Sequence, residues 1–282
     1  MRHLHVGRDR RRLRGSLRAR MMRAVDEVVA RRVDDQTAAL REEIAALRAE
    51  LTDVVTRVQG AVTEELHAAE RRSRRDLVAA GERAAVRSTS RFVEAELRDA
   101  VALPDPLATL DHAIAKAPSG GLALEFGVYT GGTLTRIADA RAGDPGGVAG
   151  FDSFEGLPET WRAGFREGVF DDVTVPPEVP GAEIVVGLFA DTLPGFLDAH
   201  PGPVDLLHLD ADLYSSTATV LDLVGPRLRP GSVVLFDEFF NYPGWEQHEA
   251  RAWREYVGTS GRTFAWEAYT VADEQVAVRI TG

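Results

Sequence analysis

A long segment without proline sets the first limit on the fold. It runs from Asp26 to Ala100, and only Gly60 and Gly81 interrupt it. Alanine, arginine, glutamate and leucine dominate the segment, and all four favour α-helix. Apolar side chains recur in it at alternating intervals of four and three residues, at Leu40, Ile44, Leu47, Leu51, Val54 and Val58. This spacing is typical of a coiled-coil seam.

We therefore predict a helical coiled-coil region over residues 22–103 that makes the chain a homo-oligomer. The alternative is a helix folded back on its own domain. After Gly60 the apolar spacing drifts, so the seam either weakens there or passes into a second helix. A coiled coil carries no chemistry of its own, and we expect none in this region.

Charge divides the chain into a basic and an acidic part. The first 20 residues hold eight arginines and one aspartate, and residues 1–100 carry a net charge of +5, against −16 for residues 101–282. We predict a disordered, solvated basic arm over residues 1–21; docking on nucleic acid or anionic lipid is the alternative. An acidic domain disfavours a nucleic-acid substrate, which would require a basic surface beside the site.

Two absences limit the chemistry and the location. The chain has no cysteine, which excludes thiolate zinc sites, iron–sulfur clusters and a cysteine nucleophile. No apolar run approaches the ~20 residues needed to span a bilayer, and the basic N-terminus lacks the apolar core of a signal peptide. We expect a cytoplasmic protein without a membrane span.

The segment Leu103–Pro106 contains two prolines, which cannot continue a helix. We place a domain boundary there, so that a separate domain covers residues 104–282. Short apolar runs alternate in it with helix-like segments, which predicts an α/β doubly wound sheet. The expected strands are 121–126, 147–151, 183–186, 204–209 and 232–236. Two further runs, 263–270 and 275–280, predict a terminal antiparallel hairpin.

Ligands of doubly wound sheets bind at the carboxyl ends of the strands. The first strand is followed by a glycine-rich turn with the sequence Glu125-Phe126-Gly127-Val128-Tyr129-Thr130-Gly131-Gly132-Thr133. Glycines let the backbone approach a ligand closely, and the preceding acid suits a cationic ligand. Asp152 ends the second strand, where a carboxylate can accept both ribose hydroxyls of a nucleoside or cap a helix. After the third strand, Leu188 and Phe189 can border an adenine ring, and Asp191 is a candidate helix N-cap.

Acidic residues follow the fourth and fifth strands. Asp210 and Asp212 end one strand, and Asp237 and Glu238 end the next. Carboxylates gathered at one edge repel each other unless a cation lies between them, and oxygen ligands suit Mg²⁺. We expect Asp210, Asp237 and Glu238 to hold Mg²⁺; the alternative is that Asp212 and Asp237 only cap the helices that follow.

Together these strings resemble class I S-adenosylmethionine-dependent methyltransferases. Glu125-Phe126-Gly127-x-x-x-Gly131-Gly132 looks like their first motif, Asp152 like their ribose-binding acid, and the terminal hairpin like their reversed last strand. The strings 152–158, 189–194 and 210–217 are similar to the macrocin O-methyltransferase family, which methylates sugar hydroxyls in macrolide and aminocoumarin biosynthesis and uses Mg²⁺. The resemblance covers about residues 105–282 and implies a Rossmann-like, seven-stranded sheet.

The resemblance also implies the reaction and the residues that serve it. A hydroxyl oxygen attacks the sulfonium methyl of S-adenosylmethionine in line, and Asp210, His208 or His248 takes the proton. The expected cofactor-binding residues lie on the three loops described above: Glu125, Gly127, Tyr129, Thr130, Gly131, Gly132, Thr133, Asp152, Ser153, Leu188, Phe189 and Asp210. We expect a sugar, a glycosylated natural product or a cell-surface glycan as the acceptor.

This sequence departs from the macrocin family in two places. Asp237-Glu238 stands where the family usually has two aspartates, and residues 239–249 differ as well. That segment is expected to line the acceptor pocket, where Phe239, Phe240, Tyr242 and Trp245 form either a sugar-stacking wall or part of the core. A phenol or catechol O-methyltransferase is one alternative function, and a coiled-coil interaction protein with a degenerate methyltransferase domain is another.

Overall fold

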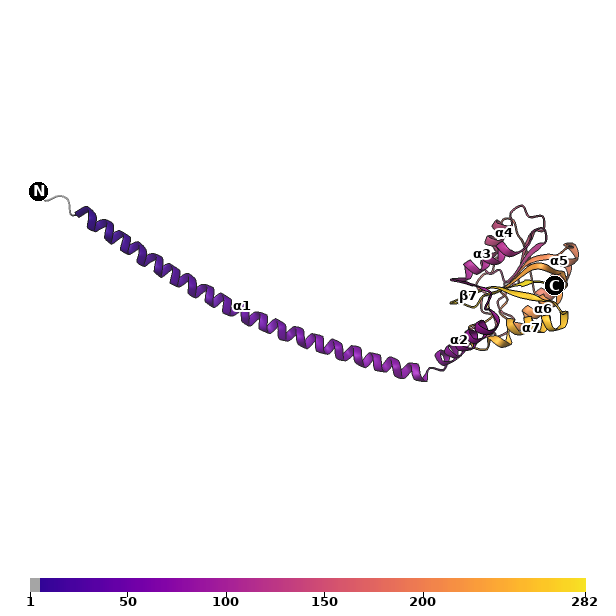
Figure 1. Ribbon diagram of the computed structural model, residues 1–282, viewed down its shortest axis with the longest axis horizontal. Helices are drawn as coiled ribbons and strands as arrows, with labels where there is room; N and C mark the ends of the chain where they lie inside the picture. Colours follow the sequence, from indigo (N-terminus) through magenta and orange to yellow (C-terminus); the bar gives the residue numbers. More distant parts are fainter. Residues whose placement is uncertain (1–5) are drawn as a thin grey trace. The chain divides into compact units, whose positions relative to one another are not determined.

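The computed structural model describes residues 6–282, with side chains from residue 17 onward, and divides the chain into two compact units at Arg75 and Asp76. The first unit consists of one helix, α1 (Val6–Arg75), which passes through Gly60 without a break (Figure 1). The expected disordered arm over residues 1–21 is therefore wrong from Val6 onward, because arginine, leucine and alanine carry the helix toward the N-terminus. The remainder of that arm lies outside the described residues.

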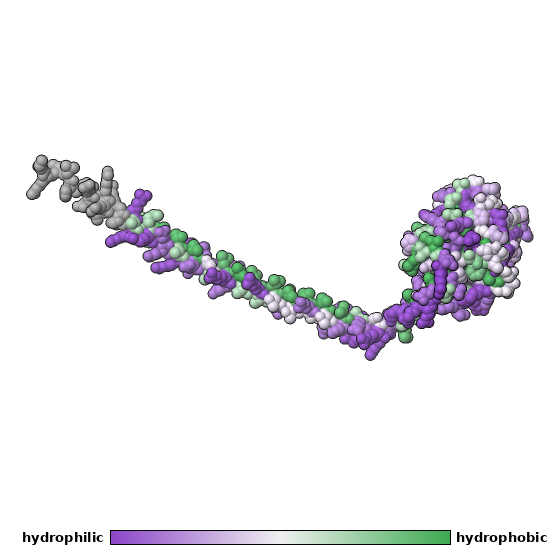
Figure 2. Space-filling view, in the orientation of Figure 1, coloured by the Kyte–Doolittle hydropathy of each residue, from purple (hydrophilic) through white to green (hydrophobic). Residues whose placement is uncertain are grey.

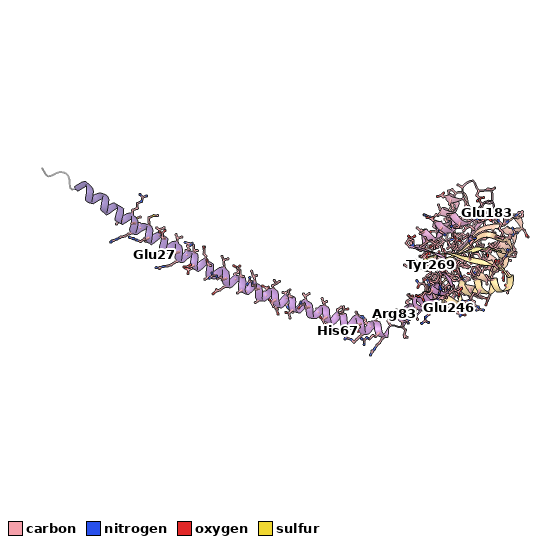
Figure 3. The ribbon with its side chains drawn as sticks, in the orientation of Figure 1. Glu27, His67, Arg83, Glu183, Glu246 and Tyr269 are labelled. Atoms are coloured by element: carbon pink, nitrogen blue, oxygen red, sulfur yellow. The ribbon has the colours of Figure 1, made fainter. Side chains whose placement is uncertain are left out.

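The described side chains of α1 are almost all exposed, as those around Glu27 and His67 show in Figure 3. Threonine hydroxyls along the helix, such as those of Thr52 and Thr56, donate to the carbonyl four residues earlier. Ion pairs such as Arg57–Asp53 link successive turns. Because isolated helices gain little stability from such local contacts, the exposed apolar positions of α1 need a partner. Whether that partner forms a coiled coil stays a prediction.

The second unit begins earlier than the sequence predicts. Helix α2 (Leu77–Glu96) starts at Asp76, whose side chain accepts the amide of Ala79. Its far end packs on the α/β domain, where the ring of Phe92 lies 5.3 Å from that of Trp245 and 5.5 Å from that of Trp266. The expected boundary at residue 103 is therefore wrong. The helical region divides at Asp76, because α2 packs Ala85 and Phe92 against the core of the second unit, whereas the described apolar side chains of α1 are exposed.

The sheet of the second unit has eight strands in the described residues, in the order β1-β7-β8-β6-β5-β2-β3-β4. They are β1 (Val101–Leu103), β2 (Leu122–Phe126), β3 (Val148–Asp152), β4 (Glu183–Val186), β5 (Val204–Leu209), β6 (Leu228–Phe236), β7 (Phe264–Thr270) and β8 (Val276–Ile280). The predicted hairpin is confirmed, and β8 lies antiparallel between β7 and β6. All other pairs are parallel.

The expected number of seven strands is wrong by one. The additional strand, β1, is only three residues long and pairs in parallel with β7 at the edge of the sheet. It precedes Pro104 directly, and such a short exposed segment gives no strand pattern in the sequence. The expected doubly wound arrangement is otherwise present, with helices on both faces.

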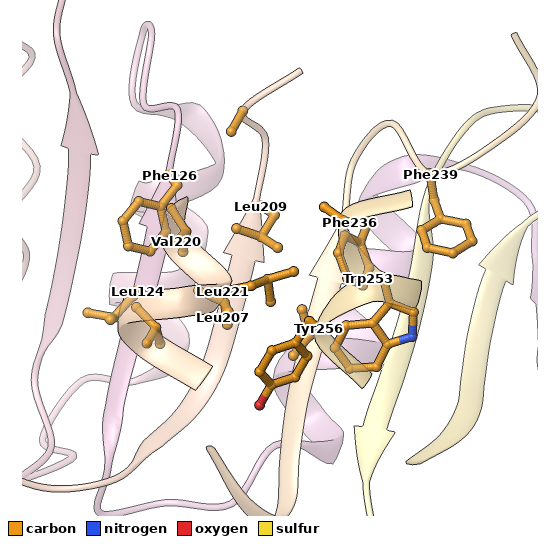
Figure 4. Close-up of a cluster of buried hydrophobic side chains, with 14 of the residues drawn as sticks. Leu124, Phe126, Leu207, Leu209, Val220, Leu221, Phe236, Phe239, Trp253 and Tyr256 are labelled. Atoms are coloured by element: carbon orange, nitrogen blue, oxygen red, sulfur yellow. The ribbon is translucent and has the colours of Figure 1, made fainter. Parts of the chain in front are cut away.

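Each strand of the sheet centre is apolar on both sides. In β5, Leu207 and Leu209 face the larger core, whereas Leu206 faces the smaller one. Figure 4 shows the larger core, where β2, β5 and β6 meet α6 and α7. Helices α2, α5 (Phe189–Ala199), α6 (Tyr214–Val224) and α7 (Glu249–Ser260) cover that face, and α3 (Pro106–Lys116) and α4 (Gly132–Ala140) cover the other. Burial on both faces requires this continuous apolar pattern.

The helix starts nearest the strand ends differ slightly from expectation. Helix α5 begins at Phe189, with Leu188 as its N-cap, so the expected cap Asp191 lies instead in the first turn. A carboxylate there still interacts favourably with the helix dipole. No helix in the described residues is both long enough and apolar enough to cross a membrane.

Candidate functional site

A cavity of about 520 Å³ opens at the carboxyl ends of β2, β3, β4, β5 and β6. Its wall includes eight of the residues predicted for the site: Gly127, Tyr129, Asp152, Ser153, Leu188, Phe189, Asp210 and Glu238. Strand order explains this convergence, because these five strands are parallel and the loops after them share one edge of the sheet.

The turn after β2 is held in place by Asp152. Its Oδ2 accepts the amides of Val128 and Tyr129, both at 2.9 Å, and its Oδ1 accepts the amide of Phe154 at 2.8 Å. Asp152 therefore ties two loops together and does not cap a helix. Because each carboxylate oxygen can accept two hydrogen bonds, Oδ1 retains capacity for one ligand hydroxyl.

Gly127 is the tightest point of this turn. Its φ is +96°, and a Cβ at this position would lie 1.8 Å from the carbonyl oxygen of Asp210. Only glycine fits such a contact at a positive φ. The β2 turn can therefore lie directly against the β5 turn, which brings both loops to the same cavity.

The other predicted residues of the β2 turn do not reach the cavity. Glu125 is fully buried, and its carboxylate accepts the Thr133 hydroxyl at 3.1 Å and lies 3.0 Å from Nδ1 of His208. Glu125 is therefore not in direct contact with the cavity, and its attraction for the cofactor stays a prediction. Thr130, Gly131, Gly132 and Thr133 are also absent from the wall. Gly131 is the N-cap of α4, and Gly132 and Thr133 lie in its first turn.

Three carboxylates that line the cavity lie close together. Oxygen atoms of Asp210, Asp212 and Glu238 all lie within 4.8 Å of one another, and each residue lines the cavity. Asp212 adopts a positive φ of 59° and is followed by Leu213, the N-cap of α6, so it does not cap the helix. The structure thus groups Asp212 with two of the predicted ligands, Asp210 and Glu238. Whether Asp212 or the predicted Asp237 completes a Mg²⁺ site stays a prediction.

Asp237 lies beside the buried His208, with its own side chain 24% exposed. Its Oδ2 accepts the side-chain amide of Gln275 at 3.2 Å, and its Oδ1 lies 3.6 Å from Nε2 of His208. Asp237 shares a second group of potential ligands with His208 and Asp210, but it does not line the cavity. No helix starts at Asp237, so it is not a cap either.

Burial and mutual repulsion make the cavity carboxylates weak acids. Burial, followed by the charge of Asp237, raises the pKa of Asp210 well above its usual value, and burial with the charge of Asp210 does the same for the pKa of Glu238. Burial raises the pKa of Asp212 to about 7. Oε2 of Glu238 is buried without a hydrogen-bond partner. An all-oxygen set with an unpartnered carboxylate oxygen fits a hard divalent cation.

The two predicted histidines lie away from the cavity wall. His208 is buried between Glu125 and Asp237. Burial lowers its pKa, but these two carboxylates together raise the pKa well above the usual value. A histidine that holds its proton is unsuited to act as a base. His248 is half-buried near the rings of Trp161 and Tyr242, and burial lowers its pKa. Of the three predicted bases, Asp210 alone lines the cavity.

The remaining wall comes from the long connection between β3 and β4. It contributes Trp161, Arg162, Phe165 and Phe170. The Arg162 guanidinium makes two hydrogen bonds to Glu274, at 2.9 and 3.0 Å, and lies 3.9 Å from the centre of the Trp161 ring. Attention to strand ends missed this segment; its aromatic residues, unusual in a connection without strand or helix periodicity, are the signal that could have found it.

The aromatic residues after β6 belong to the core, which is one of the two alternatives predicted for them. Phe239, Phe240, Tyr242 and Trp245 are each no more than 3% exposed, and none lines the cavity. Phe239 and Trp245 pack against Phe92 of α2, whereas the ring of Tyr242 lies 5.6 Å from that of Trp161. That residues 239–249 line an acceptor pocket stays a prediction.

Residues 124–239 match the model of the methyltransferase domain family. A curated relative from Streptomyces olivaceus, 8-demethyl-8-(2,3-dimethoxy-alpha-L-rhamnosyl)-tetracenomycin-C 4'-O-methyltransferase, is 31% identical over 146 residues, or 41% of this chain. The chain spans about half of that relative, 52% of its length. The calicheamicin methyltransferase CalS11 is 27% identical, covering 60% of this chain and 75% of its own with a TM-score of 0.48. The O-methyltransferase NovP is 20% identical, covering 61% and 78% with a TM-score of 0.44.

The methyltransferase domain match contains the whole cavity wall, from Gly127 to Glu238. Directly behind this wall lies one further buried acid, Glu249 at the start of α7. Its Oε2 accepts the amide of Glu238 at 3.1 Å, and its Oε1 lies 3.4 Å from the Thr217 hydroxyl. Glu249 therefore fixes the backbone from which Glu238 reaches the cavity. Sequence analysis missed it, because a glutamate in a helix resembles any surface residue.

Proposed function

We propose that the chain is an S-adenosylmethionine-dependent, Mg²⁺-assisted O-methyltransferase that acts on a hydroxyl of a sugar or of a glycosylated natural product. The observation that carries this proposal is one cavity lined by two chemically different groups of residues. Asp152, Leu188 and Phe189 belong to the first group, and the carboxylates of Asp210, Asp212 and Glu238 form the second. The Streptomyces olivaceus relative, whose name assigns it a rhamnosyl-tetracenomycin substrate, supports a sugar acceptor.

We assign the nucleoside part of the cofactor to the first group of residues, Asp152, Leu188 and Phe189. Asp152 Oδ1 can accept one ribose hydroxyl, while the amides of Val128 and Tyr129 keep the carboxylate oriented. Leu188 and Phe189 offer an apolar surface for the adenine ring. Phe189 is itself held edge-on by Phe126, with ring centres 5.1 Å apart. The acidic character of the cavity suits the sulfonium charge.

Asp210, Asp212 and Glu238 are the residues that would hold Mg²⁺. When bound, the ion would lower the pKa of an acceptor hydroxyl and fix its oxygen near the methyl group. Glu249 would keep the Glu238 backbone in place, and Arg162, which faces Asp212, would limit the excess negative charge of the wall. Asp237 and His208 would support the set from inside the sheet.

The proposed transfer is a single displacement. The acceptor oxygen forms a bond to the methyl carbon as the carbon–sulfur bond breaks, and S-adenosylhomocysteine leaves with the electron pair on sulfur. The hydroxyl proton passes to Asp210, the predicted base on the cavity wall.

A phenol or catechol acceptor is the second candidate. The observation that favours it is the aromatic side of the cavity, where Trp161, Phe165 and Phe170 offer surfaces for a flat ring. These rings serve equally for stacking on a sugar. Comparing rhamnosides with catechols as acceptors separates the two candidates, since each predicts turnover of one class.

Calorimetric titration of S-adenosylmethionine into the full-length protein, with and without Mg²⁺, tests the proposal. We expect binding by the wild type and at least tenfold weaker binding by Asp152→Ala, which also releases the Val128 and Tyr129 amides. Asp171→Ala is the matched control, because Asp171 is exposed and does not line the cavity. Absence of binding under both conditions would exclude the methyltransferase function. The chain would then be a coiled-coil interaction protein with a degenerate domain.

A further inference from the structure

We propose that α1 pairs with α1 of a second copy of this chain as a parallel, in-register, two-stranded coiled coil. This inference goes beyond the proposed function and does not rest on it. It starts from the apolar side chains of α1, which are exposed along a helix that forms a compact unit by itself. Leu40, Leu47 and Leu51 are 57%, 58% and 63% exposed.

These side chains form one line along the helix. Figure 2 shows apolar residues gathered along one side of α1, with hydrophilic residues beside them. The residues of the line that follow the heptad spacing are Val33, Thr37, Leu40, Ile44, Leu47, Leu51, Val54 and Val58. A surface patch of this length, with a constant helical period, indicates a binding face.

The line continues beyond this heptad segment, with a change of spacing at each end. From Val29 to Ala69, eleven intervals cover 40 residues, an average of about 3.6 residues per interval. This average equals the turn of a straight helix. Between Val33 and Val58 the seam positions repeat strictly every seven residues, which imposes a left-handed supercoil. The flanking intervals act as stutters, which locally unwind a coiled coil. We therefore place the tightest pairing between Val33 and Val58.

The charges beside the line identify the occupant and its direction. With Leu40 and Leu47 at position d, Arg41 and Arg48 occupy position e, and Glu43 and Glu50 occupy position g. In a parallel pair, position g faces position e five residues later on the other helix. Glu43 then faces Arg48 of the partner subunit, and the same pair forms again across the symmetry axis.

An antiparallel pair would bring like charges together. Position g then faces g and position e faces e, so Glu43 and Glu50 would meet glutamates and Arg41 and Arg48 would meet arginines. The ion pairs within the described part of α1 involve Arg57, Arg72 and Arg74, so these four charges are available for a partner. A second copy in parallel therefore satisfies both the apolar line and its charged borders.

The residue types in the line favour two strands. Ile44 and Val58 are β-branched at position a, and Leu40 and Leu47 stand at position d, which is the preference of parallel dimers. Leu51 at position a, and Val33 and Val54 at position d, make the opposite choice. The majority of the seam thus specifies a dimer.

Cysteine cross-linking of the full-length protein tests the arrangement, because the chain has no cysteine of its own. We introduce Leu40→Cys, Leu47→Cys and Val54→Cys one at a time, oxidise each variant, and separate the products on non-reducing gels. A parallel, in-register pair predicts a cross-linked dimer for all three variants. Ala49→Cys is the control, since position f points away from the seam and should stay uncross-linked.

Every other result overturns the proposal. Cross-linking of at most one seam variant would indicate an antiparallel pair, and cross-linking of none would indicate a monomer or a different partner. Light scattering of the wild type must give a mass of two copies; one copy, or three and more, contradicts the dimer. Glu43→Arg and Arg48→Glu should each weaken dimerisation at least threefold, and the double variant should restore it. These readouts do not depend on methyltransferase activity, so failure of the proposed function leaves them interpretable.

Discussion

Replacing Gly127 with alanine places a methyl group where the β5 turn already lies. The added Cβ would stand 1.8 Å from the carbonyl oxygen of Asp210 and 2.9 Å from its carbonyl carbon, so backbone must move. The φ of +96° adds a conformational cost. Overpacking costs about 1–3 kcal/mol, and an L-residue at positive φ about 1–2 kcal/mol. The expected loss of stability is therefore ~2–5 kcal/mol.

Two measurements follow from this estimate. In a domain of this size, each kcal/mol lowers the melting temperature by roughly 2–4 °C, so we expect a decrease of at least ~4 °C. A shift of the β2 turn away from Asp210 also moves one part of the cavity lining away from the carboxylates after β5. If ~2 kcal/mol of that cost appears in binding, the affinity for S-adenosylmethionine falls about 30-fold. Differential scanning calorimetry and titration calorimetry provide the two values.

Gly132→Ala is the matched control for this variant. Gly132 begins α4 a few residues later and does not line the cavity, and a methyl group added there would meet no atom within 4 Å, so this variant should change neither value. Wild-type stability together with wild-type affinity in Gly127→Ala would refute the reasoning. That result would mean that the β2 and β5 turns are not in the close contact described.

Three further predictions concern the carboxylates. Glu238→Gln removes one charge from the carboxylates that would hold Mg²⁺, so it should weaken Mg²⁺ binding at least tenfold. The loss of charge repulsion should also raise the melting temperature in EDTA. An unchanged Mg²⁺ affinity by calorimetry would exclude Glu238 as a ligand. The pKa of Asp212 is raised to about 7 in the folded state, so the folded protein binds more protons than the unfolded chain between about pH 4 and 7. In EDTA, the contribution of Asp212 to the free energy of unfolding should therefore be greatest below pH 4 and fall by up to ~4 kcal/mol as the pH rises to 7. Urea denaturation of the wild type and of Asp212→Asn at each pH isolates this contribution. A contribution that rises with pH would contradict the assignment. Glu249→Ala leaves the buried amide of Glu238 without an acceptor, which should cost ~1–3 kcal/mol of stability. The control Glu255→Ala, on the exposed side of α7, should cost less than ~1 kcal/mol. Equal losses by urea denaturation would show that Glu249 has no positioning role.

The strands of the α/β unit could be predicted because their signal is local. Strands buried on both faces read as short apolar runs, and the predicted β4 and β5 agree with the structure at both ends. The position of the cavity followed from the same pattern, since parallel strands must end at one edge. Asp152 and Asp210 were found in this way, each directly after an apolar run.

The choice among neighbouring acids could not be predicted. Asp237 and Glu238 are adjacent in the sequence, but one faces His208 inside the sheet and the other faces the cavity. Asp212 reaches the cavity through a positive φ that no sequence pattern announces. Which carboxylate points outward depends on strand register and turn geometry, and these are set by pairing with strands far away in the chain.

The sequence by itself determined the helical N-terminal region, the alternation of strands and helices, and the edge of the sheet where a ligand can bind. Each of these depends on periodic burial or on backbone propensity within a short window. The tertiary structure decided the division at Asp76, the burial of Phe239 and Trp245 beneath α2, and the aromatic wall from the β3–β4 connection. The physical reason is that an aromatic side chain gains similar free energy from a core and from a cavity wall, so only its neighbours in space decide which one it joins.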